Sequence, residues 1–394
     1  MGCDAMLLLP TEAGQLEPYQ IVGNPLVPRP PRVPLTRVAF AAAHVVSDPL
    51  RERNPWDSRP AVDWQATLAF RRSLWDQGFG LAEAMDTAQR GMGVDWATAL
   101  ELIQRTMAAA RTHPLAPRVA CGAGTDHVAL ADLRSADAIL AAYEHQAEAI
   151  EAAGGQLILM ASRAFTAMGA DQATYASVYR RLIDGARDPV ILHWLGDMFD
   201  PALAGYWGSN DVARASDFVL GLISENPGKV DGIKISLLDQ AHEVAFRARL
   251  PAGVRLYTGD DFNYPDLIAG DGSHHSHALL GIFAAIAPAA SQALEALAEG
   301  DMARYHALLA PTVPLSREVF RSPTRFYKAG IAFLSWLNGH QSHFIMPGGL
   351  QSSRDITHYA ALFRLADQAR LLAMPDLAEA RMKLLLALHG VEQR

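Results

Sequence analysis

The sequence predicts a (β/α)8 barrel, or TIM barrel, that is followed by a C-terminal helical extension. Short apolar runs of strand character alternate with amphipathic segments such as SADAILAAYEHQAEAIEAAG, which is long enough to be a crossover helix. Eight such strand–helix units fit between residues 35 and 290, and parallel barrel strands read as apolar runs because both of their faces are buried. A doubly wound open sheet would normally show a glycine fingerprint after its first strand, and AFAAAHVVSD contains none.

The pattern divides the chain into three parts. Residues 1–34 are expected to form an extended arm, because the stretch NPLVPRPPRVP is rich in proline. Residues 35–290 hold the barrel, and residues 291–394 show helical period and form the extension. The expected strands are 36–42, 78–84, 117–124, 155–162, 189–196, 230–236, 254–261 and 271–278, the last being the least strand-like.

Composition excludes several classes of function. The formal net charge is −8 and no basic run occurs, which argues against nucleic acid or an acidic membrane surface as a partner. Two cysteines, Cys3 and Cys121, cannot make a disulfide framework, and their spacing does not suggest zinc. No apolar stretch is long enough to span a membrane, and the N-terminus lacks the positive region of a signal peptide. A soluble, cytoplasmic protein with a small-molecule partner is expected.

Lys234 lies in the sixth expected strand, within the apolar run VDGIKISLL. The chain has only four lysines against 30 arginines, so a lysine inside a strand invites a chemical explanation. Desolvation lowers the pKa of a buried amine, and a neutral amine can attack a carbonyl to form a Schiff base. The alternative is a lysine that extends to the rim or pairs with a carboxylate such as Asp261, which is the commoner case. Position alone leaves both interpretations open.

Other polar side chains follow the expected strands, where barrel enzymes carry their active sites. His193, on the fifth strand, is a candidate proton shuttle because imidazole titrates near neutrality, although a histidine at a strand end is structural about as often. The candidate substrate-binding residues are Asp86, Thr87, Arg163, Asp260, Asp261, His274 and His277.

Several segments together resemble one known superfamily. GIK in the sixth strand, followed by LYTGDDFNYPDLIAGDGSHHSHALLGIFAAIAP, resembles the GIK and SGDD patterns of the dihydrodipicolinate synthase and N-acetylneuraminate lyase superfamily. VACGAGTDHVALADLRSADAILAAYEHQAEAIEAAGGQLILMAS is similar to its third and fourth strand units, and PVILHWLG to its PVILYN segment. The likeness covers roughly residues 35–340 and rests on the order and spacing of these motifs. It implies class I aldolase or lyase chemistry on a (β/α)8 barrel, Lys234 as the Schiff-base lysine, and a homodimer or homotetramer.

The departures from that pattern concern substrate recognition. The GTTGE segment with which the family grips the substrate carboxylate appears here as MDTAQRG, where Thr87 survives beside Asp86 and is followed by Arg90. The tyrosine that the family places after strand four as a proton relay is replaced within ASRAF. Either the substrate lacks a simple 2-keto-acid head, or Arg163 supplies the carboxylate contact as a planar fork. The proton shuttle must then come from elsewhere, and His193 is the first candidate.

The SHHSH segment, residues 273–277, leaves a second chemistry open. Its histidines, with Asp260 or Asp261, could hold a divalent metal, bind substrate hydroxyls or merely cap a turn. A metal-dependent aldolase or isomerase at His274 to His277 is therefore one alternative. A barrel that has lost catalysis and binds a sugar or acts in regulation is another, suggested by the missing tyrosine.

The function expected from the sequence is a Schiff-base-forming lyase or aldolase. Lys234 would form an imine with a keto acid or a sugar-derived carbonyl compound, and a bond β to the imine carbon would break or form. This chemistry needs no cofactor and no metal. Walls rich in histidine and aspartate favour a polyhydroxylated substrate over a bare pyruvate condensation.

Overall fold

The computed structural model describes residues 6–51 and 59–393, so Cys3 lies outside the described residues. The chain divides into two compact units. The barrel unit comprises Arg37–Ala43 and Phe79–Gly281, and the helical unit comprises Met1–Thr36, His44–Gly78 and Ile282–Arg394. Within the described ranges, no helix combines the length and apolar character that a membrane crossing requires.

The barrel unit is a closed barrel of eight parallel strands, which confirms the predicted fold class. Neighbouring strands follow the order β10-β3-β4-β5-β6-β7-β8-β9, so the eighth barrel strand closes on the first. The strands are β3 (Ala39–Ala42), β4 (Gly80–Glu83), β5 (Val119–Ala123), β6 (Gln156–Leu159), β7 (Val190–Leu195), β8 (Val230–Ser236), β9 (Arg255–Thr258) and β10 (His277–Leu280).

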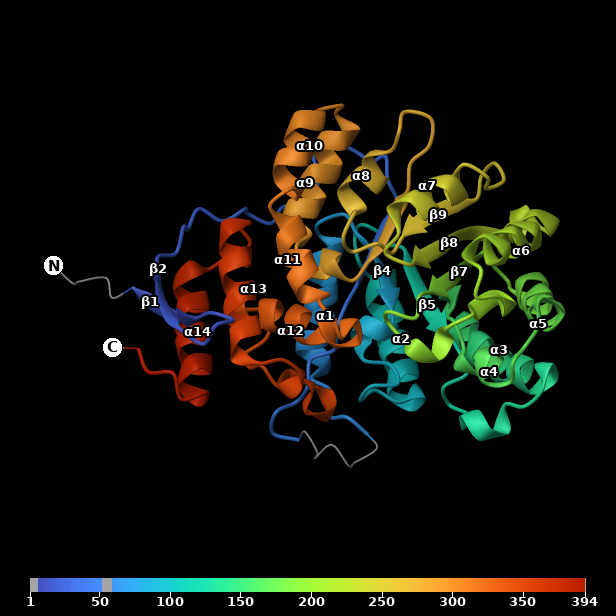
Figure 1. The fold of residues 1–394 in the computed structure, drawn as a ribbon, viewed down its shortest axis with the longest axis horizontal. Helices are drawn as coiled ribbons and strands as arrows, with labels where there is room; N and C mark the ends of the chain where they lie inside the picture. Colours follow the sequence, from blue (N-terminus) through green and yellow to red (C-terminus); the bar gives the residue numbers. More distant parts are fainter. Residues whose placement is uncertain (1–5, 52–58, 394) are drawn as a thin grey trace. The chain divides into compact units, whose positions relative to one another are not determined.

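Helices follow the strands and lie outside them, as α3, α5 and α6 do beside the green strands in Figure 1. Aspartate or serine begins most of the long ones: the side chain of Ser135, for example, accepts a hydrogen bond from the amide of Ala138. The helices of this unit are α2 (Trp96–Arg111), α3 (Ala136–Ala153), α4 (Arg163–Ala167), α5 (Gln172–Gly185), α6 (Val212–Glu225), α7 (Gln240–Arg247) and α8 (Tyr264–Ala269).

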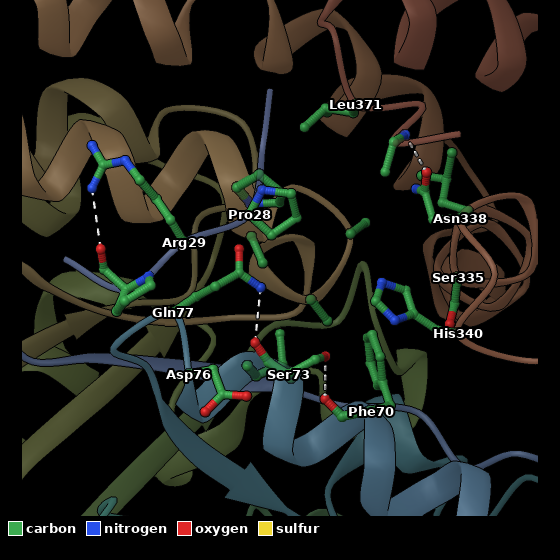
Figure 2. A pocket seen from close by; sticks show the side chains of 18 residues that line it. Pro28, Arg29, Phe70, Ser73, Asp76, Gln77, Ser335, Asn338, His340 and Leu371 are labelled. Atoms are coloured by element: carbon green, nitrogen blue, oxygen red, sulfur yellow. Dashed lines mark hydrogen bonds between the residues drawn. The ribbon is translucent and has the colours of Figure 1, made fainter. Parts of the chain in front are cut away.

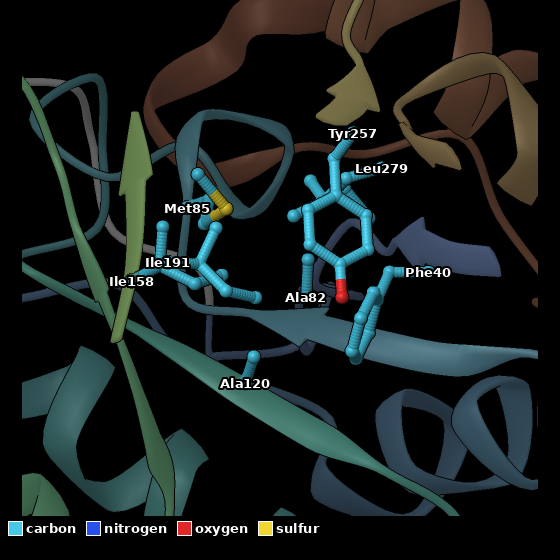
Figure 3. Packing of buried hydrophobic residues seen from close by; sticks show 9 residues of the cluster. Phe40, Ala82, Met85, Ala120, Ile158, Ile191, Tyr257 and Leu279 are labelled. Carbon is cyan, nitrogen blue, oxygen red and sulfur yellow. The ribbon is translucent and has the colours of Figure 1, made fainter. Parts of the chain in front are cut away.

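Two aromatic rings fill the interior of the barrel (Figure 3). The rings of Phe40 and Tyr257 meet edge to face with their centroids 5.7 Å apart. Each ring occupies the space beside a glycine, because a Cβ at Gly80 would lie 2.8 Å from Phe40 and one at Gly232 would lie 2.7 Å from Tyr257. Tyr257 also donates a hydrogen bond to Asp231, at the N-terminal end of β8. The interior is therefore packed, and any reacting group has to sit above these rings.

The helical unit contains the N-terminal segment and most of the helices after the barrel. The segment begins with an antiparallel hairpin of β1 (Leu7–Pro10) and β2 (Leu16–Tyr19), which the sequence analysis did not separate from the arm. Arg29 then makes a two-pronged ion pair with the buried Glu295, 2.7 Å for each bond. The helices are α1 (Trp64–Trp75), α9 (Ala287–Ala298), α10 (Met302–Leu309), α11 (Thr312–Val319), α12 (Tyr327–Leu337), α13 (Ile356–Gln368) and α14 (Pro375–Leu388).

A cavity of about 250 Å³ lies inside the helical unit. Figure 2 shows Gln77 on one side of it and Ser335, Asn338 and His340 on the other. The hydroxyl of Ser335 and the side-chain oxygen of Gln77 are buried and make no hydrogen bond to any described residue. A buried polar group without a partner has a desolvation cost that no interaction offsets.

Replacing Ser335 by alanine should therefore leave the free energy of unfolding unchanged or raise it by up to about 1 kcal/mol. Ser291 is the matched control, since its hydroxyl is also buried but donates a hydrogen bond to the carbonyl of Gln77 at 2.7 Å. Ser291→Ala should lower the free energy of unfolding by about 1–3 kcal/mol, because it removes this hydrogen bond. Urea unfolding of both variants measures the difference, and an equal loss in the two would contradict the expectation.

Candidate functional site at the C-terminal ends of the barrel strands

Lys234 points into the barrel. In the register of the sheet it lies beside His193 of β7 and Tyr257 of β9. Residues paired across parallel strands face the same side, and Tyr257 belongs to the interior cluster, so Lys234 faces the interior as well. Tyr257 reaches toward Asp231 at the N-terminal ends of the strands, which leaves the opposite end to the lysine amine.

Two carboxylates act electrostatically on the amine of Lys234. Burial lowers the pKa of Lys234 below its usual range, and the carboxylates of Asp86 and Asp261 act against that shift by favouring the ammonium form. Asp86 begins the short 3-10 helix Asp86–Ala88 after β4, and Asp261 follows β9. Three of the residues selected from the sequence thus interact through their charges.

His193 is buried next to Lys234 and is neutral. Burial, reinforced by the nearby charge of Lys234, lowers the pKa of His193 well below its usual range. Its Nε2 lies 3.5 Å from the hydroxyl of Ser236, the last residue of β8. A neutral imidazole beside an amine can accept a proton. Ser236 was not selected from the sequence, because its contact with His193 depends on the pairing of β7 with β8.

Because Gly259 has no side chain, the side chain of Lys234 can occupy the space beside it. A Cβ at this position would be 2.1 Å from the hydroxyl of Ser236, 2.8 Å from the carbonyl of Ile235 and 2.8 Å from Cε of Lys234. Real Cβ atoms do not approach other atoms so closely, so a side chain here must displace the lysine or its strand.

Gly259→Ala should therefore reduce imine formation at Lys234 at least ~10-fold, because the amine is pushed from its place. The free energy of unfolding should also fall by about 1–3 kcal/mol. Gly221→Ala is the matched control: this glycine lies within α6 and an added Cβ would meet nothing within 4 Å. Adduct yield and thermal unfolding of both variants are the measurements, and normal adduct formation in Gly259→Ala would contradict the packing argument.

The segment after β4 is held by buried polar contacts. The carboxylate of Glu83 accepts hydrogen bonds from the amide of Ala84 at 2.9 Å and the hydroxyl of Thr106 at 2.6 Å. Thr87, also buried, is part of this segment. Arg90 forms a two-pronged ion pair with Asp126, with bonds of 2.9 and 2.6 Å.

Two other selected residues are already engaged elsewhere. Arg163 is exposed at the start of α4 and pairs with Asp200 at 2.5 Å. Asp260 is buried, and its carboxylate accepts hydrogen bonds from the amides of Phe262 and Asn263, at 2.8 and 2.9 Å. Asp260 therefore stabilises the turn that leads into α8, while its neighbour Asp261 acts on Lys234.

The predicted position of the SHHSH segment was wrong. The eighth barrel strand spans His277–Leu280, whereas the predicted strand spanned 271–278, so most of the segment precedes the strand and lies at the N-terminal end of the barrel. His277 accepts a hydrogen bond from the amide of Val38 at 2.9 Å, and His274 is exposed. No group of three or more His, Cys, Asp or Glu among the described residues is arranged to hold a metal ion. Neither histidine shares the site of Lys234.

One tyrosine near the site was missed in the sequence. The hydroxyl of Tyr206 lies 3.1 Å from the amide of Ser162, which it binds as an acceptor, and 2.8 Å from the hydroxyl of Tyr179. Ser162, in turn, shares a hydrogen bond of 2.6 Å with Thr125 at the end of β5. Tyr206 comes from the loop before α6, far along the chain from Ser162, so no local pattern could have indicated the contact.

A protein-family model described as "Protein of unknown function (DUF993)" matches residues 7–391 of the chain. A search of curated proteins found no match. Solved structures, in contrast, include many with the same fold.

YagE, a prophage protein of the dihydrodipicolinic acid synthase family from E. coli K12 solved in complex with pyruvate, has a TM-score of 0.61 and 14% identity, covering 91% of this chain and 100% of its own. Dihydrodipicolinate synthase from Aquifex aeolicus has a TM-score of 0.58 and 12% identity over 91% of this chain and 99% of its own. The enzyme from Oceanobacillus iheyensis has a TM-score of 0.56 and 13% identity over 76% and 86%. These likenesses confirm, at the level of the fold, the resemblance inferred from the sequence.

Proposed function

This chain belongs to the family described as "Protein of unknown function (DUF993)", and we propose that it is a Schiff-base-forming lyase or aldolase with Lys234 as its nucleophile. The observation that carries the proposal is the environment of Lys234. Lys234 faces the barrel interior beside the neutral His193, burial lowers the pKa of its amine, and the charges of Asp86 and Asp261 act on that amine. Dihydrodipicolinate synthases share this fold, and the chemistry is proposed from the residues of the site, since a fold alone does not determine function.

The reaction begins when the neutral amine of Lys234 adds to a carbonyl carbon. The carbinolamine takes up one proton and loses one water, which leaves a protonated imine bonded to Nζ. Asp86 and Asp261 stabilise this cation because their carboxylates already favour positive charge at the same nitrogen.

Bond cleavage then needs a base. In the retro-aldol direction, the imidazole of His193 removes the proton of the substrate hydroxyl β to the imine carbon. The electron pair of the breaking C–C bond moves toward the imine and forms an enamine, while an aldehyde leaves. Protonation of the enamine and hydrolysis of the imine release the second product and restore Lys234. In dehydration, the base instead removes a proton from the carbon between the imine carbon and the hydroxyl-bearing carbon, which gives the enamine. The hydroxyl group then takes up a proton and leaves as water when its C–O bond breaks.

The charges around the site favour a substrate without a carboxylate. Arg90, which follows β4, and Arg163, which follows β6, are paired with Asp126 and Asp200. The carboxylates of Asp86 and Asp261 repel an anion and can accept hydrogen bonds from hydroxyl groups. A sugar-derived aldehyde or ketone therefore suits the site better than a simple keto acid.

Borohydride trapping tests the proposal directly. The protein is incubated with pyruvate, dihydroxyacetone or glyceraldehyde, reduced, digested and mapped by mass spectrometry. With only four lysines in the chain, each modified peptide identifies its lysine. A reduced adduct on Lys234 with a hydroxylated carbonyl compound, in higher yield than with pyruvate, is the expected result. No adduct on Lys234 with any of them would refute the Schiff-base mechanism.

The same experiment separates the alternatives. A metal-dependent reaction at the SHHSH segment finds no support in the fold, since that segment lies at the N-terminal end of the strands. A barrel without catalysis would bind a hydroxylated ligand without forming a reducible adduct. Turnover that a chelator abolishes, with no adduct on Lys234, would favour the metal alternative.

A further inference from the structure

The end of β4 has a strained backbone. Ala84, the residue after the strand, has a φ of 52°, in the left-handed region that residues with a side chain seldom adopt. Gln89, at the end of the 3-10 helix, has a φ of 62°. Such strain persists only where surrounding contacts hold it, and it often marks a functional segment. Between these two residues lies Asp86, one of the carboxylates beside Lys234.

Arg90 makes the contacts that hold this segment. Beyond its ion pair with Asp126, its guanidinium donates to the carbonyl of Ala84 at 3.4 Å and to the carbonyl of Gly122 at 2.5 Å. It also donates to the side-chain oxygen of the buried Gln146. One planar fork thus ties the strained residue after β4 to the end of β5 and to α3.

The side chain of Arg90 is too buried to contact a substrate. Its side chain is 3% exposed, and the ring of Trp96 lies 4.8 Å from its guanidinium carbon. Every bond described above goes to a protein group. In the sequence, Arg90 is recognisable only as a neighbour of Thr87, and no role was predicted for it.

We propose that Arg90 is a positioning residue, which holds the segment after β4 so that the carboxylate of Asp86 stays beside the amine of Lys234. The proposal rests on the proposed function in one respect: the amine that Asp86 faces is taken to be the nucleophile. It goes further by assigning the placement of that carboxylate to a residue that touches neither Lys234 nor substrate. Lysine cannot replace Arg90 in this role, because an ammonium lacks the fork that reaches Asp126 and two carbonyls together.

The pKa of the Lys234 amine reports on the arrangement without any substrate. Acetylation by a small dose of acetic anhydride at a series of pH values, followed by mass mapping, gives the titration of Lys234 in the whole protein. Asp86 and Asp261 are the carboxylates that face the amine, and His193 is its neutral neighbour. Loss of one carboxylate should move the midpoint downward, because less negative charge then favours the ammonium form.

A double-mutant cycle isolates the role of Arg90. Arg90→Lys keeps the charge, so a downward shift of the Lys234 midpoint by about half a pH unit or more reflects lost positioning. Asp86→Asn should give a shift in the same direction. In the Asp86→Asn background, Arg90→Lys should add little, since the carboxylate it positions is already absent. Equal shifts in both backgrounds, or no shift in either, would overturn the proposal.

Two further measurements keep the test decisive. Asp126→Asn leaves Arg90 in place but weakens its ion pair, so it should give a smaller shift in the same direction even if Arg90→Lys folds poorly. Circular dichroism at the pH of each assay shows whether a variant is folded. If the Schiff-base function is wrong, the unmodified protein will give no borohydride adduct. The acetylation measurements test the positioning role of Arg90 independently of that result.

Discussion

Lys234→Met is expected to abolish the borohydride-trapped adduct and to lower any lyase activity at least ~10³-fold. A thioether cannot form an imine, and no other lysine of the barrel unit is in the sheet interior beside His193. Methionine has a similar length and fills the space above Tyr257, so the fold should be kept. Because the change removes an amine whose ionised form is costly to bury, the free energy of unfolding should stay the same or rise.

Lys383→Met is the control for the chemistry of the method. This lysine is on α14 and pairs with Glu379 at 2.6 Å, four residues earlier on the same helix. Its loss should leave the adduct and activity unchanged, since a partly exposed pair of this kind contributes little. An adduct that persists in Lys234→Met and maps to another lysine would show that the nucleophile had been placed wrongly.

The order of the barrel strands was predictable because it depends on local patterns. Strands buried on both faces are apolar throughout, and β5 and β7 each occur within a predicted strand, at Val119–Ala123 and Val190–Leu195. The sixth strand was located from Val230 to Ser236, with the same bounds in the structure. Lys234 was noticeable for the same reason, because a charge within such a run is conspicuous.

The bounds of the eighth strand were predicted wrongly because the local sequence signals conflict. Residues 273–277 are all polar and could form the end of a strand. The observed strand, His277–Leu280, is only four residues long and is followed directly by Gly281 and Ile282. A short apolar strand followed by a helical segment does not show where it begins. The error moved two histidines to the wrong end of the barrel, and with them the metal-site alternative.

The residues that hold the site in place could not be predicted from the sequence, because their contact partners are far away along the chain. Arg90 meets Asp126 and Gln146, 36 and 56 positions further along the chain. Gly259 matters because of atoms on the adjacent strand, at Ser236 and Lys234. Such contacts depend on the register between strands, which a single sequence does not give.

Stability should fall steeply as the pH is lowered from about 6.5 to about 4, because buried histidines must take up protons. Burial, more than any charge, lowers the pKa of His44 to about 4 and that of His277 to about 3. The pKa of His193 is lowered well below its usual range for the same main reason. The unfolded chain binds more protons than the folded chain below the ordinary pKa of 6.5, so folding is favoured less as the pH falls.

The size of the effect can be bounded for His44. A shift from 6.5 to about 4 corresponds to at most about 3–4 kcal/mol, since one pKa unit is worth about 1.4 kcal/mol. His44 belongs to the helical unit, and His193 and His277 belong to the barrel unit, so both units should lose stability in the same window. His44→Gln should make the slope below pH 6.5 shallower. Urea unfolding at half-unit steps of pH measures it, and a stability that rises on acidification would contradict the expectation.

Glu243 should limit stability on the alkaline side. Its carboxyl group is buried on α7, where it accepts hydrogen bonds from Ser276 at 2.7 Å and Thr258 at 3.0 Å, and burial raises its pKa to about 8. The folded chain holds this proton up to about pH 8 while the unfolded chain releases it near 4.5, so the stability it contributes is lost as the pH rises.

The histidines and Glu243 act in opposite directions, so the free energy of unfolding should have its maximum near pH 6.5. Below that pH several histidines outweigh the single carboxyl, and above it the carboxyl acts without them. Glu243→Gln removes the titration and keeps one oxygen that accepts a hydroxyl hydrogen bond, while its amide N–H can donate to the oxygen of the other hydroxyl. It should flatten the curve between pH 6.5 and 8 and steepen the fall in stability between pH 6.5 and 4.5, where Glu243 opposes the histidines. His44→Gln should instead make the acid side shallower and leave the curve above pH 6.5 unchanged. A change above pH 6.5 in His44→Gln, or no change there in Glu243→Gln, would mean that the titrating groups had been misassigned.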